Sequence, residues 1–330
     1  MLEGFSNASR IPELRRRLWF TAMMLVVYRA GVAVPTPGID GQALAAFFDA
    51  ASSTLFGWVN LFSGGALERF SVFALGIMPY ISVAIILDLL KVAWPYLDEL
   101  YKEGEAGRRK ISQYTRYGTV LLSVVQGFMI AVSLEHIQAP GGGSVVYAPG
   151  WSFRIITVLT VTAGSLFVMW IGEQVTERGI GNGISLIIMA GIVANLPHAL
   201  AATLELGRTG ALSPVFILAF ILIAVAVIAF IVFMERAQRR IVIQYPKRQV
   251  GTRMFGGDST HMPLKINTSG VIPPIFASSI LLVPATIAGF SGGANAPGWV
   301  SWISGQLAHG QPLYMAMYAG LIVFFSYFYT

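Results

Sequence analysis

Apolar runs long enough to cross a lipid bilayer recur along this chain, and they constrain its fold more than any other feature. A helix that crosses the bilayer core needs about 20 mostly apolar residues. We predict eight such spans, over residues 18–34, 75–92, 117–134, 151–171, 180–200, 214–234, 270–290 and 312–329. Only 12% of the residues are charged, about half the share of a typical soluble domain. The chain is therefore predicted to be an all-α polytopic membrane protein.

Basic residues indicate which connections face the cytoplasm. Most of them lie in the N-terminal segment and in the connections 91–116 and 235–269. Under the positive-inside rule these segments are cytoplasmic, and so are both ends of the chain. The connection 235–269 also contains a strand-like run at 240–245. It would suit phosphate-rich RNA or an acidic protein surface, or it sets topology alone.

Two spans begin alike, with GIMPYI at 76–81 and GVIPPI at 270–275. The first of these spans runs inward and the second outward, which is the inverted-repeat pattern of transport proteins. Their offset of five spans predicts ten spans in a complete protein, of which eight are present. Pro79 and Pro273 predict helix starts or bends nearby, because proline is tolerated in a first helical turn.

Enzyme signatures are not found. The sequence has no HExxH and no paired carboxylates within a span, and the lack of cysteine excludes thiol chemistry and disulfides. Arg29 and Asp88 are charged residues within spans, and they form no evident relay. The inverted repeat leaves an ion-coupled secondary transporter as an alternative, whereas an intramembrane hydrolase would need a nucleophile and base that we do not find.

Six stretches together resemble the SecY family, whose members are the central subunits of the bacterial Sec protein-conducting channel. They are IPELRRRL (11–18), FSGGALERFSVFALGIMPYIS (62–82), KEGEAGRRKISQYTRYGT (102–119), GEQVTERGIGNGIS (172–185), ERAQRRIVIQYPKRQ (235–249) and PLKINTSGVIPPIFASSI (263–280). The resemblance implies ten transmembrane helices in two inverted halves. Residues 1–208 would form the first half, with helices one to five. Residues 209–330 would form a C-terminally truncated second half, with helices six to eight.

The resemblance also implies an hourglass pore with a ring of aliphatic side chains at its waist. The matching ring residues are Ile77, Ile81, Ile188, Ile275 and Ile280. A short plug helix over about 60–73 would close the external funnel, with Asn60, Ser63, Gly64, Gly65, Glu68 and Arg69.

A lateral gate to lipid is implied between spans two and three and spans seven and eight. Its candidate residues are Ser82, Asp88, Ser278, Ser279 and Val283. Asp88 departs from the family, where an uncharged polar residue such as Gln is expected. The long loop at about 235–269 matches the docking surface for the ribosome and the motor ATPase SecA, with Lys247, Arg248 and Arg253 as contact residues.

The implied function is a passive channel in the bacterial cytoplasmic membrane, with a cytoplasmic N-terminus and with no catalysis and no cofactor. It would pass unfolded secretory polypeptides across the membrane and release transmembrane segments to lipid. The implied partners are the SecE and SecG subunits, SecA, the ribosome, signal sequences and nascent chains, with SecDF, YidC and membrane lipids as further candidates.

Overall fold

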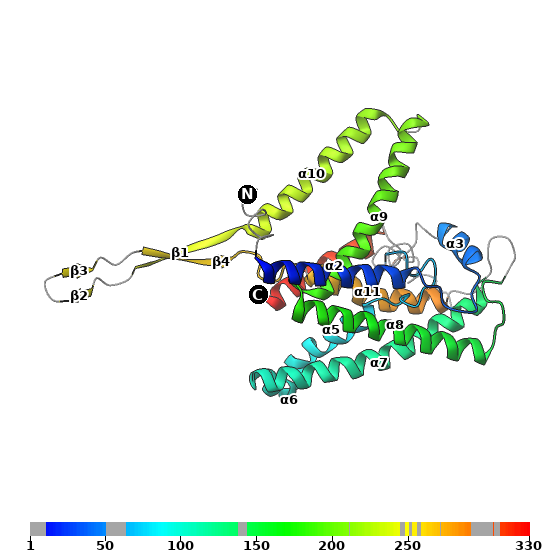
Figure 1. Ribbon diagram of the computed structural model, residues 1–330, viewed down its shortest axis with the longest axis horizontal. Coiled ribbons are helices and arrows are strands. Elements are labelled where there is room, and N and C mark those ends of the chain that lie inside the picture. The colour runs from blue at the N-terminus through cyan, green and yellow to red at the C-terminus, as the bar shows by residue number, and fades with distance from the viewer. Residues whose placement is uncertain are drawn as a thin grey trace. The chain divides into compact units, whose positions relative to one another are not determined.

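The computed structural model describes residues 11–50, 64–137, 144–210, 212–244, 248–250, 253–255, 259–270, 272–291, 306 and 311–330. Its longer helices are α2 (Pro12–Val32), α3 (Gly41–Ala50), α5 (Met78–Ala93), α6 (Pro95–Lys102), α7 (Glu105–His136), α8 (Trp151–Arg178), α9 (Gly183–Arg208), α10 (Pro214–Arg236), α11 (Ile272–Ser291) and α13 (Pro312–Tyr329) (Figure 1). The chain forms two compact units: Met1–His198 with Ser278–Tyr318, and Ala199–Ala277 with Ala319–Thr330. The division into halves at residue 208 stays a prediction.

Each predicted span coincides with one helix. Prolines begin several of these helices, as at Pro12, Pro214 and Pro312, because the first turn has no use for the N–H group that proline lacks. Among the described residues, five helices are long and apolar enough to cross a bilayer alone, and α5 with α6 would make a sixth, bent by 104°. The helix α2 is less apolar because it begins before the apolar run and includes three consecutive arginines. The chain is thus a mostly helical, multi-pass membrane protein, as predicted.

Small residues allow close packing in the first unit, where α8 contacts α2, α5 and α7. An added Cβ on Gly127 of α7 would lie 3.6 Å from the Cα of Val158 on α8, and one on Gly118 would lie 2.6 Å from Val83 on α5. An added Cβ on Gly183 of α9 would overlap the backbone of Gly172 on α8. Small residues of this kind are how membrane helices approach one another.

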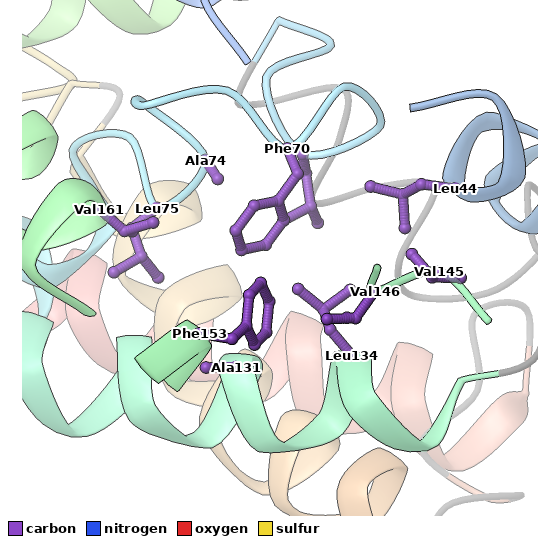
Figure 2. Close-up of a cluster of buried hydrophobic side chains, with 11 residues drawn as sticks. Leu44, Phe70, Ala74, Leu75, Ala131, Leu134, Val145, Val146, Phe153 and Val161 are labelled. Atoms are coloured by element: carbon purple, nitrogen blue, oxygen red, sulfur yellow. The ribbon is translucent and has the colours of Figure 1, made fainter. Parts of the chain in front are cut away.

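A cluster of buried apolar side chains joins three segments that are distant in sequence. Figure 2 shows Phe70 and Phe153 at its centre, with Leu44 of α3 and Val146 beside them. Isolated bridges between Pro35 and Ser71 and between Ile39 and Val146 align the same segments. The connections after α2 and after α7 are therefore packed together over residues 64–77.

The second unit contains an arm of two short antiparallel sheets. The strand β1 (Gln238–Gln244) pairs with β4 (Ser259–Lys265), and β2 (Arg248–Val250) pairs with β3 (Arg253–Phe255). In Figure 1 the second pair lies beyond the far end of the first. The strand-like run predicted at 240–245 is thus confirmed over most of its length. No residue of α10, all of which the structure describes, is buried.

Candidate functional site

Residues 64–77, here called the turn segment, lead into α5 and contain the described part of the predicted plug. The segment forms consecutive turns: the Ser71 N–H donates to the Ala66 carbonyl at 2.8 Å, and the Gly76 N–H donates to the Phe73 carbonyl at 2.8 Å. Gly64, with a φ of +68°, adopts a left-handed conformation that interrupts a helix. The expectation of a helix is therefore wrong for residues 64–73. The predicted plug residues Asn60 and Ser63 lie outside the described residues.

The middle of the turn segment is held by backbone hydrogen bonds. The Thr36 N–H donates to the Phe70 carbonyl at 2.9 Å, and the Val72 N–H donates to the Val34 carbonyl at 2.9 Å. On the opposite side, an added Cβ on Gly164 of α8 would overlap the Val72 carbonyl oxygen. This part of the segment therefore sits between the connection after α2 and the backbone of α8.

An aromatic column holds the next residue along. The Phe73 ring stacks on Tyr28 of α2 and on Phe167 of α8, each with ring centroids 6.0 Å apart, and Phe167 in turn stacks on Trp170. Phe73 is 4% exposed. The column fixes the segment just before it enters α5.

Arg29 of α2 reaches the start of the turn segment. Its guanidinium Nη1 donates to the Gly64 carbonyl oxygen at 2.6 Å. An added Cβ on Gly64 would lie 2.9 Å from the Cα of Gly191 on α9. A cavity of about 90 Å³ opens here, lined by Arg29, Val32, Ala33, Gly64, Gly65, Glu68, Arg69 and Asn195. The predicted plug residues Gly64, Gly65, Glu68 and Arg69 thus share one cavity wall with Arg29.

The helix α5 begins where the first two predicted ring residues lie. Its N-cap is Ile77, and Pro79 falls in its first turn, as the sequence predicts. Ile77 and Ile81 are 6% and 5% exposed, and one helical turn separates them, so they share a face. Ile77 packs against α8, since an added Cβ on Gly172 would lie 3.6 Å from its Cδ1 atom.

The neighbouring helix α9 contributes Ile187 to the packing around Gly172 of α8. Ile187 is 1% exposed, and its Cδ1 atom would lie 3.5 Å from the added Cβ on Gly172. Ile188, the predicted ring residue, is half-buried, and its direction differs from that of Ile187 by about 100°. Ile280 is half-buried, and Ile275 belongs to the second unit. The ring as a whole stays a prediction.

The helix α11 contacts the first residue of α5. The Ser279 hydroxyl donates to the Met78 sulfur at 4.0 Å, and Ser279 is 3% exposed. Ser82 and Ser278 are half-buried, and the side chain of Val283 lies outside the described residues. This contact joins one residue of each of two predicted gate helices, and the gate itself stays a prediction.

Asp88, the remaining predicted gate residue, bonds across the bend between α5 and α6. The Tyr101 hydroxyl of α6 donates to Asp88 Oδ1 at 2.7 Å, and the Lys91 ammonium lies 4.5 Å from the centre of the Tyr101 ring. The unexpected carboxylate therefore has a partner within the chain.

Two ion pairs between α7 and α8 escaped the sequence reasoning. Arg154 binds Glu135 through two nitrogens, one of them at 3.0 Å, and Glu135 is nearly buried. Arg116 binds Glu173 with distances of 3.0 and 2.8 Å. The partners of both pairs are far apart in sequence, so no local sequence pattern predicts them.

The predicted contact residues of the basic loop lie toward the tip of the arm. Arg248 in β2 faces Phe255, and Arg253 in β3 faces Val250 in the two-stranded register. Lys247 lies outside the described residues. The described residues hold no group of three or more His, Asp or Glu that could bind a metal ion.

Comparison with known proteins agrees with this architecture. The SecY family model matches residues 71–330. The protein translocase subunit SecY of Buchnera aphidicola subsp. Acyrthosiphon kondoi is 53% identical over the whole chain, which covers 92% of that protein. Among solved structures, a protein conducting channel superposes with a TM-score of 0.58 over 84% of the chain, and Sec61 in the canine ribosome-channel complex with a TM-score of 0.54 over 84%. The chain spans 58% and 59% of these two, and both are 16% identical to it, so they show the fold alone.

Proposed function

The chain belongs to the SecY family, and on that basis we propose that it forms the core of a protein-conducting channel. It passes unfolded polypeptides across the cytoplasmic membrane and releases transmembrane segments into lipid. The observation that carries this proposal is the junction at Ile77, where the turn segment ends and α5 begins. At this junction the segment predicted to close the pore ends and the predicted gate helix α5 begins, with the predicted ring residue Ile77 between them.

The junction suits a channel that must stay closed to ions. Ile77 and Ile81 present branched aliphatic groups on one face of α5, and such groups offer nothing to replace the hydration shell of an ion. A constriction of this kind excludes ions by dewetting. It also yields to a passing side chain, because no hydrogen bond must be broken.

The contact between α5 and α11 suits lateral release. It includes a hydrogen bond from the Ser279 hydroxyl to the Met78 sulfur, which is weak because thioether sulfur is a poor acceptor. Small residues flank it at Ala277 and Ser278. We propose that this seam of small residues parts when a transmembrane segment passes into lipid.

The arm suits docking at the cytoplasmic side. Its strands carry basic residues such as Arg239 and Arg240, which are exposed, and Arg248 and Arg253 follow toward the tip. Clustered cations attract phosphate-rich surfaces through release of counterions. We propose that the arm contacts the ribosome or SecA, and that SecE and SecG complete the assembly. Energy then comes from these partners, because the proposed channel is passive.

A reconstitution experiment separates the channel from the alternative transporter. Vesicles containing the chain, its SecE and SecG partners, SecA and ATP would be given a precursor protein with and without its signal sequence. The proposal predicts that only the precursor with a signal sequence becomes protected from added protease. Uptake of a small solute driven by a proton gradient, with no precursor protection, would instead favour the transporter.

A further inference from the structure

The short, glycine-rich connection 179–182 joins α8 to α9, and α9 starts in close contact with α8. An added Cβ on Gly183, the first residue of α9, would overlap the carbonyl oxygen of Gly172 on α8. It would also lie 2.8 Å from the Cβ of Val175. The start of α9 therefore packs against the backbone of α8 at a position that has no room for a side chain.

One hydroxyl group bridges the two helices at this point. The Thr176 hydroxyl of α8 donates to the Gly172 carbonyl of its own helix at 2.8 Å and accepts from the Gly183 N–H of α9 at 2.9 Å. The first N–H groups of a helix have no partner within that helix, and Gly183 is buried. Thr176 thus satisfies a buried donor, and a buried donor without a partner is costly.

The connection is also tied to α2. The Thr21 hydroxyl accepts from the Ile180 N–H at 3.2 Å and donates to the Arg17 carbonyl of its own helix at 2.9 Å. An added Cβ on Gly179 would lie 2.5 Å from the same hydroxyl oxygen. The connection is therefore held by α2 at its beginning and by α8 where α9 starts.

The buried residues of α9, all of which the structure describes, fall on a single face. They are Gly183, Ile187 and Gly191, and residues four apart lie on the same side of a helix. Ile187 lies beside Gly172 of α8, and the Cα of Gly191 would lie 2.9 Å from an added Cβ on Gly64. Ile187 is thus the large side chain on the face that α9 turns toward α8 and the turn segment.

Apolar residues surround α9, so burial alone does not select the face that turns inward. The hydrogen bond from Gly183 to Thr176 does select it, because a rotation of α9 would carry the Gly183 N–H away from the hydroxyl. We propose that Thr176 is a positioning residue that fixes the rotation of α9 about its axis. The predicted ring residue Ile188 then takes its direction from the same bond, about 100° from Ile187. The part of this rotation in closing a pore rests on the proposed function, whereas the bridge itself does not.

Thiol labelling of the full chain in detergent tests the bridge. The chain contains no cysteine, so a single introduced cysteine reports on its own site. Ile187→Cys places a thiol on the buried face of α9, and its rate of reaction with a small maleimide measures how often that face opens. Thr176→Val keeps the branched shape and removes the hydroxyl, which leaves the Gly183 N–H without its acceptor. Loss of the acceptor of a buried donor should raise the labelling rate about 5- to 100-fold.

Matched variants make the result specific. Thr119→Val on α7 removes a buried hydroxyl that donates to the carbonyl one turn earlier on its own helix, and it should leave the labelling rate unchanged. Thr176→Ser keeps the hydroxyl and should keep the rate close to that of the parent. Gly183→Ala keeps the Thr176 hydroxyl but forces α9 away from α8, and it should accelerate labelling as well.

Three results would overturn the proposal. They are an unchanged labelling rate in Thr176→Val, an equal acceleration by Thr119→Val, and a rate in Thr176→Ser as high as that in Thr176→Val. The first would show that the bridge does not hold α9, the second that any lost hydroxyl loosens the helices, and the third that the hydroxyl is not the cause.

Resting ion conductance in planar bilayers separates the bridge from the proposed function. It is measured on Thr176→Val without the introduced cysteine. Faster labelling with raised conductance supports both. Faster labelling with unchanged conductance supports the bridge and counts against α9 as part of a closed pore wall.

Discussion

Replacing Gly164 by alanine should disrupt the packing of the turn segment against α8. The Cβ of Gly164→Ala would overlap the Val72 carbonyl oxygen. Neither atom can rotate away, because a Cβ is fixed by the helix backbone and the oxygen belongs to the backbone of the turn segment. Overpacking of this kind costs about 1–3 kcal/mol. A clash that no side-chain rotation can relieve belongs in the upper half of that range. Alanine recovers about 1 kcal/mol through its higher helix propensity. The net destabilisation is therefore expected to be about 1–2 kcal/mol.

The assay is thermal unfolding in detergent, followed by the intrinsic fluorescence of the 7 tryptophans. A loss of 1–2 kcal/mol corresponds to an apparent Tm lower by roughly 2–8 °C for a unit of this size, with variants heated at one scan rate because membrane-protein unfolding is seldom reversible. Gly320→Ala on α13 is the matched control, because an added Cβ there would meet nothing within 4 Å. Its apparent Tm should be unchanged or raised. If Gly164→Ala were as stable as Gly320→Ala, the close contact between the turn segment and α8 at Gly164 would be refuted.

Three further predictions concern the ring, the bend and the arm. Replacing Ile77 and Ile81 together by glycine should raise the resting ion conductance in planar bilayers, and unchanged conductance would count against a hydrophobic constriction. Tyr101→Phe removes the hydrogen bond to Asp88 and should lower the apparent Tm, because a half-buried hydrogen bond contributes about 1 kcal/mol to stability. Asp88→Asn keeps an acceptor for the Tyr101 hydroxyl and should lower the apparent Tm less. Equal decreases in Tm for the two variants would show that this hydrogen bond is not the cause. Arg248→Glu should weaken ribosome binding and reduce the slope of log affinity against log salt concentration by about one. An unaltered affinity would show that the tip of the arm is not part of the docking surface.

The spans and the start of α5 could be predicted because they depend on local sequence. Apolar length defines the helices, and Pro79 marks the first turn of α5 where the structure places it. The bend after α5 has a local cause too, since Pro95 begins α6 after Trp94, although the sequence analysis did not use it.

A helix was predicted wrongly for residues 64–73, because their conformation depends on distant contacts. Residues 64–73 are held by Thr36, Val34 and Gly164, and three glycines in the turn segment adopt left-handed conformations. A short apolar stretch in such surroundings follows its tertiary contacts rather than its helix propensity.

Partners far apart in sequence could not be assigned at all. Arg29 donates a hydrogen bond to Gly64, and Arg154 forms an ion pair with Glu135. No residue spacing in the sequence predicts either pair. The choice between Ile187 and Ile188 depends on the rotation of α9 about its axis. Apolar residues on all sides of a membrane helix leave that rotation undefined.

The most direct test of the channel is photocrosslinking from Ile81 to a polypeptide in transit. A photoreactive residue at Ile81, which lies at the proposed pore waist, would be compared with one at Val225 on the exposed surface of α10. With a stalled nascent chain that carries a signal sequence, the account predicts a crosslink from position 81 and none from position 225, and loss of the crosslink when the signal sequence is removed. Absence of a crosslink from position 81, or an equal yield from both positions, would contradict the claim that polypeptides pass through this site.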